Sequence, residues 1–211
     1  MKNLIIIGAR GFGRELSDFA KDCEGYGKEF LLKGFLDDNE IALDGFQNYP
    51  NILGSVEDYV VQENDVFICG LGSLKWSEYY TKIIISKGGI FINLIHQEAV
   101  IRSNVVLGIG NVIGKGTLIS TDVKIGNFTQ IMTYCILGHD VIVGENCRIG
   151  DYSFLGGFTQ VEDNVFIAVR ATVLDRIKIK TWSTIGAGSV VIKNVAQNTT
   201  VFGNPAKKIE F

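Results

Sequence analysis

Residues 113–142 decide the fold when they are written six at a time: IGKGTL (113–118), ISTDVK (119–124), IGNFTQ (125–130), IMTYCI (131–136) and LGHDVI (137–142). The same frame extends in both directions without a slip, and an aliphatic residue opens all sixteen blocks from Ile101 to Val191. A helix would repeat about every 3.6 residues and a half-buried strand about every two. A period of six instead predicts short strands joined by corners, with three blocks in each coil of a parallel β-helix.

Glycine often follows the aliphatic position, as at Gly114, Gly126 and Gly138, and we expect these glycines to permit the turns at the corners. Four places after the aliphatic residue lies a second small or β-branched side chain, such as Thr129 or Cys147. A single block is too small to bury its aliphatic side chain, but stacked coils align these side chains in a dry column. The period does not determine the hand of the coil.

The first ninety residues have a different pattern, in which apolar runs alternate with amphipathic stretches. The run Lys2–Ile7 predicts a buried parallel strand. It leads into the glycine-rich turn GARGFG (8–13) and a predicted helix over 14–21, an arrangement in which backbone N–H groups face a phosphate. Further strands are predicted at 30–36, 65–70 and 90–93, with a second helix at 76–87.

These patterns divide the 211-residue chain into two domains. Residues 1–93 are predicted to form a Rossmann-like α/β domain built from βαβ units, followed by a linker over 94–100. The parallel β-helix is predicted over 101–195, and residues 196–211 form a C-terminal tail.

The composition narrows the expected partners. The formal net charge is −3 and no basic cluster is interleaved with aromatic residues, so neither nucleic acid nor an anionic membrane surface is expected as a partner. The apolar run Leu4–Ile7 is too short for a signal peptide or a membrane span, which predicts a cytoplasmic protein. The four cysteines lie far apart, without metal-binding spacing, and are interpreted as buried apolar side chains.

The glycines of the first turn, Gly8, Gly11 and Gly13, follow the order G-x-x-G-x-G rather than the G-x-G-x-x-G of dinucleotide-binding domains. The domain is also too short for a full doubly wound sheet, so a nicotinamide dehydrogenase is disfavoured. Two interpretations of the turn stay open: it binds phosphate, or its glycines only permit close packing of strand and helix. The acid pair Asp37-Asp38 likewise either contacts a ligand or is a solvated strand end.

Five segments carry a resemblance that covers essentially the whole chain: GARGFGRE (8–15), GFLDD (34–38), NLIHQEAVI (93–101), GHDVIVGEN (138–146) and VFGNPAKKI (201–209). Together they resemble the bacterial sugar acyltransferases of the sialic acid O-acetyltransferase type and the nucleotide-sugar 4-amino N-acetyltransferases. The resemblance implies a left-handed β-helix and a homotrimer. It also implies acetyl-coenzyme A in the groove between neighbouring β-helices and a nucleotide-sugar site on the N-terminal domain.

The resemblance also implies roles for individual residues. Contacts with the nucleotide sugar fall on Gly8, Arg10, Gly11, Phe12, Asp37, Asp38 and Gly72. The base of the acyl transfer falls on His139, with Asp140 as the acid that supports it. His139 is the one histidine of the predicted β-helix, and the frame places it at a corner, where a side chain can leave the stack. Imidazole suits this role because it titrates near neutral pH. His96 is interpreted as structural.

The expected co-substrate is acetyl-coenzyme A, and thioester chemistry requires no metal. Its contacts are implied at Arg148, Val169, Gly186, Ala187, Gly188 and Lys207. At Arg148 the chain departs from the resemblance, because many such enzymes carry there a second histidine that contacts the acetyl carbonyl. An arginine can polarise that carbonyl or pair with a coenzyme phosphate. It is also compatible with a different acyl donor or with a lost activity.

The leading hypothesis is therefore transfer of an acetyl group to the amino group of a nucleotide-linked amino sugar in surface glycan biosynthesis. O-acetylation of a sugar such as sialic acid is one alternative, and a catalytically inactive, nucleotide-sugar-binding trimer is another. A β-helix carbonic anhydrase is disfavoured because its zinc requires three histidines.

Overall fold

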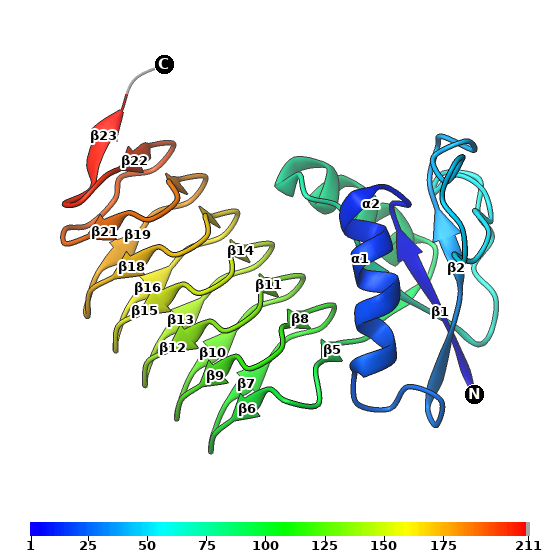
Figure 1. Cartoon of the computed structure of the whole chain (residues 1–211), viewed down its shortest axis with the longest axis horizontal. Coiled ribbons are helices and arrows are strands. Elements are labelled where there is room, and N and C mark those ends of the chain that lie inside the picture. Colours follow the sequence, from blue (N-terminus) through cyan, green and yellow to red (C-terminus); the bar gives the residue numbers. More distant parts are fainter. Residues whose placement is uncertain (210–211) are drawn as a thin grey trace. The chain divides into compact units, whose positions relative to one another are not determined.

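The computed structural model describes residues 1–209 and divides the chain into two compact units, Met1–Gln97 and a unit that begins at Glu98 (Figure 1). No helix within residues 1–209 is long and apolar enough to cross a membrane. All four cysteines are buried and free. Burial raises the pKa of three of them to about 12 (Cys23, Cys135 and Cys147), so these side chains are thiols near neutral pH and not nucleophiles.

The first unit contains a four-stranded parallel sheet in the order β2-β1-β3-β4. Its strands are β1 (Lys2–Ile7), β2 (Phe30–Leu36), β3 (Asp65–Cys69) and β4 (Ile90–Phe91). The central strands are apolar almost throughout and buried, as expected for parallel strands that are covered on both faces. A further short strand, β5 (Leu94–Ile95), lies at the end of this unit.

Two helices follow the two central strands. Helix α1 (Gly11–Phe19), continued by a 3₁₀-helix over Ala20–Asp22, follows β1, and α2 (Leu74–Ser86) follows β3. Because β1, β2 and β3 are parallel, their carboxyl ends meet at one edge of the sheet, and both helices begin there.

A buried ion pair ties β2 to β3. The Asp65 carboxylate accepts hydrogen bonds from Lys33 Nζ at 2.7 Å, from the Tyr59 hydroxyl at 2.7 Å and from the Gln62 N–H at 3.1 Å. Burial alone would raise the pKa of Asp65, but these hydrogen bonds outweigh it and hold the pKa below its ordinary value. The pair therefore anchors the long segment that connects β2 to β3, because Tyr59 and Gln62 of this segment also bind Asp65.

The second unit is a left-handed parallel β-helix with three faces and 18 residues per coil, as in the pairing of Ile136 with Phe154. The first face contains β6 (Val100–Ile101), β9 (Leu118–Ile119), β12 (Ile136–Leu137), β15 (Phe154–Leu155), β18 (Thr172–Val173) and β21 (Val190–Val191). The second face contains β7 (Val106–Leu107), β10 (Lys124–Ile125), β13 (Ile142–Val143), β16 (Gln160–Val161) and β19 (Lys178–Ile179). The third face contains β8 (Val112–Ile113), β11 (Gln130–Ile131), β14 (Arg148–Ile149), β17 (Phe166–Ile167), β20 (Thr184–Ile185), β22 (Thr200–Phe202) and β23 (Lys207–Ile209).

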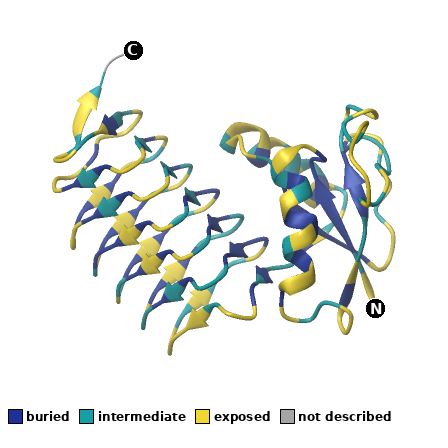
Figure 2. Cartoon of the chain, in the orientation of Figure 1, coloured by how far each residue is buried: buried dark blue, intermediate teal, exposed yellow. Residues whose placement is uncertain are grey.

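The aliphatic residues that open the six-residue blocks fill the interior, and from Ile113 to Val191 each is at most 3% exposed. Figure 2 shows these buried positions recurring in every coil. Polar side chains satisfy the backbone of the corners: Thr117 Oγ1 donates to the Met132 carbonyl at 2.6 Å and accepts from the Cys135 N–H at 3.2 Å. The interior therefore combines an apolar column with ladders of hydroxyl groups.

The corners turn at a position that the sequence analysis did not identify. One residue per corner, three places after the aliphatic residue, has a left-handed backbone, and most such residues are not glycine: Asn104, Asp122, Phe128, Tyr134, Asp140, Asn146, Tyr152, Phe158, Asn164, Arg170, Arg176 and Trp182. The expectation that the glycine after the aliphatic residue permits the turn is wrong. A Cβ at Gly114 would lie 2.4 Å from the Met132 carbonyl carbon of the next coil, so glycine is needed there because successive coils approach closely.

Candidate functional site

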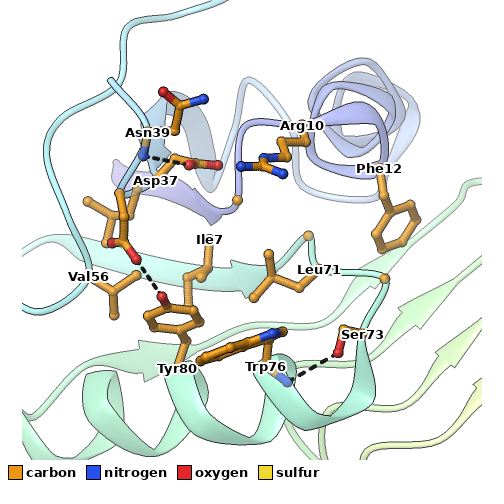
Figure 3. A pocket seen from close by; sticks show the side chains of 15 residues that line it. Ile7, Arg10, Phe12, Asp37, Asn39, Val56, Leu71, Ser73, Trp76 and Tyr80 are labelled. Carbon is orange, nitrogen blue, oxygen red and sulfur yellow. Dashed lines mark hydrogen bonds between the residues drawn. The ribbon is translucent and has the colours of Figure 1, made fainter. Parts of the chain in front are cut away.

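A pocket of about 470 Å³ lies at the carboxyl ends of β1, β2 and β3 in the first unit (Figure 3). Its lining includes six of the seven residues predicted to contact a nucleotide sugar: Gly8, Arg10, Phe12, Asp37, Asp38 and Gly72. The seventh, Gly11, is the first residue of α1 and does not line the pocket. Segments that are far apart in the sequence thus supply one cavity.

Helices α1 and α2 both begin at this pocket, and the first backbone N–H groups of a helix have no acceptor within that helix. Helix α2 is capped by Ser73, whose hydroxyl accepts the Trp76 N–H at 3.5 Å. Helix α1 packs directly on the preceding turn, because a Cβ at Gly13 would lie 1.8 Å from the Gly8 carbonyl oxygen. Two helix N-termini with Arg10 at the rim form an environment suited to an anion such as a diphosphate.

The two acids at the end of β2 have different roles. Asp37 binds the backbone with both carboxylate oxygens: its Oδ2 accepts the Ala9 N–H at 2.8 Å and its Oδ1 accepts the Asn39 N–H at 2.9 Å. Asp37 therefore fixes the glycine-rich turn to the end of β2. Asp38 Oδ2 accepts the Tyr80 hydroxyl, and this hydrogen bond raises the pKa of Tyr80, so the phenol stays a donor. Both oxygens of Asp37 accept a backbone N–H and, within residues 1–209, only one oxygen of Asp38 accepts a hydrogen bond, so Asp38 has the greater remaining capacity to accept from a ligand.

The sequence analysis did not single out three residues of α2 and its cap that line the pocket: Ser73, Trp76 and Tyr80. A signal for them was present. Helix α2 follows β3 as α1 follows β1, so its first turns face the same edge of the sheet, and Trp76 and Tyr80 are one helical turn apart.

In the β-helix, His139 lies at the edge between the first and second faces, which we call the His139 edge (residues 138–141 and their counterparts in other coils). Its Nδ1 lies 2.8 Å from Asp140 Oδ2. Because a carboxylate only accepts, the neutral ring that makes this hydrogen bond donates from Nδ1 and keeps the lone pair on Nε2. The side chain is 56% exposed, so a substrate can reach Nε2.

Two residues of the next coil hold the imidazole in place. The Phe158 ring meets it edge-on at 5.0 Å between centroids, and a Cβ at Gly157 would lie only 3.0 Å from Nε2. The sequence analysis missed both residues, although adding the 18 residues of one coil to His139 and Asp140 points to them.

The residues predicted to contact coenzyme A lie elsewhere on the β-helix. Val169, Gly186, Ala187 and Gly188 lie at the edge between the third and first faces, which we call the Val169 edge (residues 168–171 and 186–189). There the Gly188 N–H donates to the Val169 carbonyl at 2.9 Å.

Arg148 and Lys207 belong to the third face itself. Arg148 lies on β14, across the coil from the His139 edge, and Lys207 lies on β23, opposite Phe202 of β22. A single chain therefore does not bring the predicted base and the predicted coenzyme contacts together. Across residues 1–209, no three His, Cys, Asp or Glu side chains are grouped so that they would hold a metal ion.

Comparison with known proteins gives the same two parts. Residues 3–79 match the PglD N-terminal domain, and residues 122–157 match the bacterial transferase hexapeptide family (six repeats). The two matches fall one in each compact unit, residues 3–79 in the first and residues 122–157 in the second. A serine acetyltransferase of Buchnera aphidicola is 35% identical over 120 residues, 54% of this chain and 36% of that enzyme. The matched parts of the first curated relatives span only 24% to 36% of their length.

Solved structures of similar fold span the whole chain. A variant of perosamine N-acetyltransferase from Caulobacter crescentus, solved with CoA and GDP-perosamine, superimposes with a TM-score of 0.90 and 23% identity, over 100% of this chain and 98% of that one. The acetyltransferase domain of PglB from Neisseria gonorrhoeae, solved with acetyl coenzyme A, gives a TM-score of 0.74 and 22% identity over 99% of each chain. The predicted fold class, a Rossmann-like α/β domain followed by a left-handed parallel β-helix, is confirmed.

Proposed function

We propose that the protein is an acyltransferase that moves the acetyl group of acetyl-coenzyme A to a nucleotide-linked sugar, with a sugar amino group as the acceptor. The observation that carries this proposal is the exposed His139–Asp140 pair on a hexapeptide-repeat β-helix. The ligands bound in two proteins of the same fold, CoA with GDP-perosamine in one and acetyl coenzyme A in the other, support it.

In this mechanism the nitrogen of the acceptor amine attacks the thioester carbonyl, and His139 Nε2 accepts a proton from that amine. A C–N bond forms, the C–S bond breaks, and the proton passes to the departing coenzyme thiolate. Asp140 holds the imidazole in the tautomer that leaves Nε2 free and stabilises the positive ring that forms. A base positioned in this way contributes roughly 10²–10⁴ in rate.

The pocket of the first unit supplies the second part of the proposal. The N-terminus of α1 and Arg10 suit the diphosphate of a nucleotide sugar, and Asp38 offers an acceptor for a hydroxyl or N–H group of the nucleotide. Asp37, in contrast, holds the turn in shape and does not need to touch the ligand.

The proposal also requires more than one copy of the chain. The outward side chains of the first face form a stripe that is apolar except at Thr172, in register from coil to coil: Val100, Leu118, Ile136, Phe154, Thr172 and Val190. Ile136 and Phe154 are 42% and 38% exposed in the single chain. The His139 edge and the Val169 edge flank this face, so packing it against another copy would bring the base of one chain to the coenzyme contacts of the next. Such a contact joins different edges, as in the head-to-tail interfaces of cyclic oligomers, and we propose that it closes into a homotrimer.

Thiol release from acetyl-coenzyme A, measured over a panel of amino and hydroxy nucleotide sugars, tests this function. His139→Ala is expected to lose roughly 10²–10⁴ of the rate, and Asp140→Asn part of it. Asp122→Asn is the matched control, because Asp122 occupies the corresponding corner one coil earlier, and it is expected to keep full activity. Full activity in His139→Ala would refute the mechanism. Binding of a nucleotide sugar without any thiol release would instead indicate a binding protein.

A further inference from the structure

The pocket of the first unit has an aromatic wall that the proposed acyl transfer does not use. Trp76, in the first turn of α2, lines the pocket and is 51% exposed. Figure 3 shows its indole beside the Tyr80 ring on the α2 side of the pocket, across from Arg10. A large apolar side chain left half-exposed in a cavity is a candidate contact for a ligand.

The indole is held in place before any ligand binds. Trp76 stacks on Tyr80, with 5.8 Å between ring centroids and 28° between planes, and meets Tyr79 edge-on at 5.7 Å. Tyr80 is fixed in turn by its hydrogen bond to Asp38 at the end of β2. The ring is thus supported on two sides, and a ligand that stacks on it does not have to order it first.

The chemistry of the two sides of the pocket identifies the ligand that matches both. One side offers the N-terminus of α1 and Arg10, which suit phosphate groups, and the other side, on α2, offers a flat aromatic surface. A nucleotide carries an anionic group and a planar ring at its two ends. Every nucleobase has a π-face, so aromatic stacking holds bases with little dependence on their identity.

We propose that Trp76 is the platform on which the nucleobase of the nucleotide sugar stacks, while the diphosphate lies across the pocket at the N-terminus of α1. This inference rests on the proposed function, in which a nucleotide-linked sugar occupies this pocket, and adds the residue that holds its base. It makes Trp76 a binding residue and gives it no part in the acyl transfer at His139.

The chain allows a direct optical test, because it contains two tryptophans, Trp76 and Trp182, and the second lies at a corner of the β-helix. In a Trp182→Phe variant all tryptophan emission comes from Trp76. Titration with UDP, GDP and dTDP, without acetyl-coenzyme A, is expected to quench this emission to saturation. Pyrophosphate is expected to compete with these nucleotides without quenching.

Calorimetry on Trp76 variants gives the energetic test. Trp76→Leu is expected to weaken binding of a nucleoside diphosphate roughly 5- to 150-fold, Trp76→Phe is expected to retain most of the affinity, and pyrophosphate binding is expected to be unchanged. Trp182→Leu is the matched control, because Trp182 is 40% exposed but belongs to the other unit, and its nucleotide affinity should equal that of the wild type. Melting temperatures of all variants establish that each one is folded.

The proposal is overturned if no nucleoside diphosphate binds, if one binds without quenching, or if Trp76→Leu weakens pyrophosphate as much as nucleotide. Its failure is separable from that of the proposed function. Quenching in a protein that releases no thiol supports the platform and removes the acyl transfer. Acyl transfer with an unchanged KM for the nucleotide sugar in Trp76→Leu removes the platform alone.

Discussion

Replacing Gly157 with alanine tests whether the position of the His139 imidazole matters, and not only its presence. The added Cβ would lie 3.0 Å from both Cε1 and Nε2 of His139. Unstrained contacts between such atoms begin near 3.5 Å, so the ring must move by about 0.5 Å. The ring has room to do so, because the side chain is 56% exposed. The fold is therefore expected to tolerate the change.

The expected effect on activity follows from that displacement. A misplacement of about 1 Å costs roughly 10²-fold in rate, so about 0.5 Å implies roughly a tenfold lower kcat. The free energy of unfolding should change by less than about 1 kcal/mol, since alanine also restricts the unfolded chain. Kinetics of thiol release and thermal melts measure the two effects. The Cε1–H signals of the two histidines in proton NMR report the ring movement, with buried His96 as the internal reference.

Gly150→Ala is the control, because its Cβ would lie 2.6 Å from the Val169 backbone nitrogen in the next coil. Here the backbone must move, and a loss of about 1–3 kcal/mol of stability is expected. A Gly157→Ala protein with a shifted His139 signal and a wild-type kcat would refute the role given to the imidazole. Wild-type stability in Gly150→Ala would refute the explanation of these glycines by close coil spacing.

Three further predictions concern the acid pair, the buried ion pair and the apolar stripe. Asp37→Asn should lower the free energy of unfolding by about 1–2 kcal/mol, whereas Asp38→Asn should leave it nearly unchanged and weaken nucleotide binding. If the two variants behave alike in denaturation and in calorimetry of nucleotide binding, the division of roles is contradicted. Because the pKa of Asp65 is lower in the folded state, its contribution to stability is complete above the unfolded pKa of about 4 and is lost as the pH falls through the folded pKa. In urea denaturation across this range, the free energy of unfolding should fall less steeply with decreasing pH in Asp65→Asn than in the wild type. The same dependence on pH in both proteins would contradict this role of Asp65. Ile136→Glu should dissociate the proposed trimer, as measured by analytical ultracentrifugation, and abolish acyl transfer. Ile142→Glu should do neither, because Ile142 is 43% exposed but lies on the second face. An intact trimer in Ile136→Glu would count against the proposed interface.

Much of the architecture was readable from local pattern. The strands predicted at 2–7 and 30–36 are β1 and β2 with the same bounds, and the six-residue frame reproduces the strands of the β-helix. The pattern succeeds because each strand of a stacked coil repeats the environment of the strand before it. It did not foresee β22 and β23, which fall at 200–209 where the six-residue frame has ended and where the sequence analysis placed a tail.

The site was predictable only in part. Motif order drew attention to Arg10, Asp37 and Asp38, and these residues do line one pocket. The division of labour between the two acids depends on the Ala9 N–H and on the Tyr80 hydroxyl, which lie 28 and 42 residues away in the sequence. Such partners are set by tertiary packing and leave no local signal. The roles of the individual residues in binding and catalysis stay predictions.

The 18-residue coil has a consequence for chain length. An insertion of a few residues inside the β-helix would expel every later aliphatic side chain from the interior, whereas an insertion of one whole coil would restore the register of all three faces. Such a whole-coil insertion between His139 and Val169 would move the Val169 edge along the axis by one strand spacing, about 4.8 Å, while leaving the fold intact. The number of coils between these residues thus sets the axial separation of the His139 edge and the Val169 edge in discrete steps of one strand spacing.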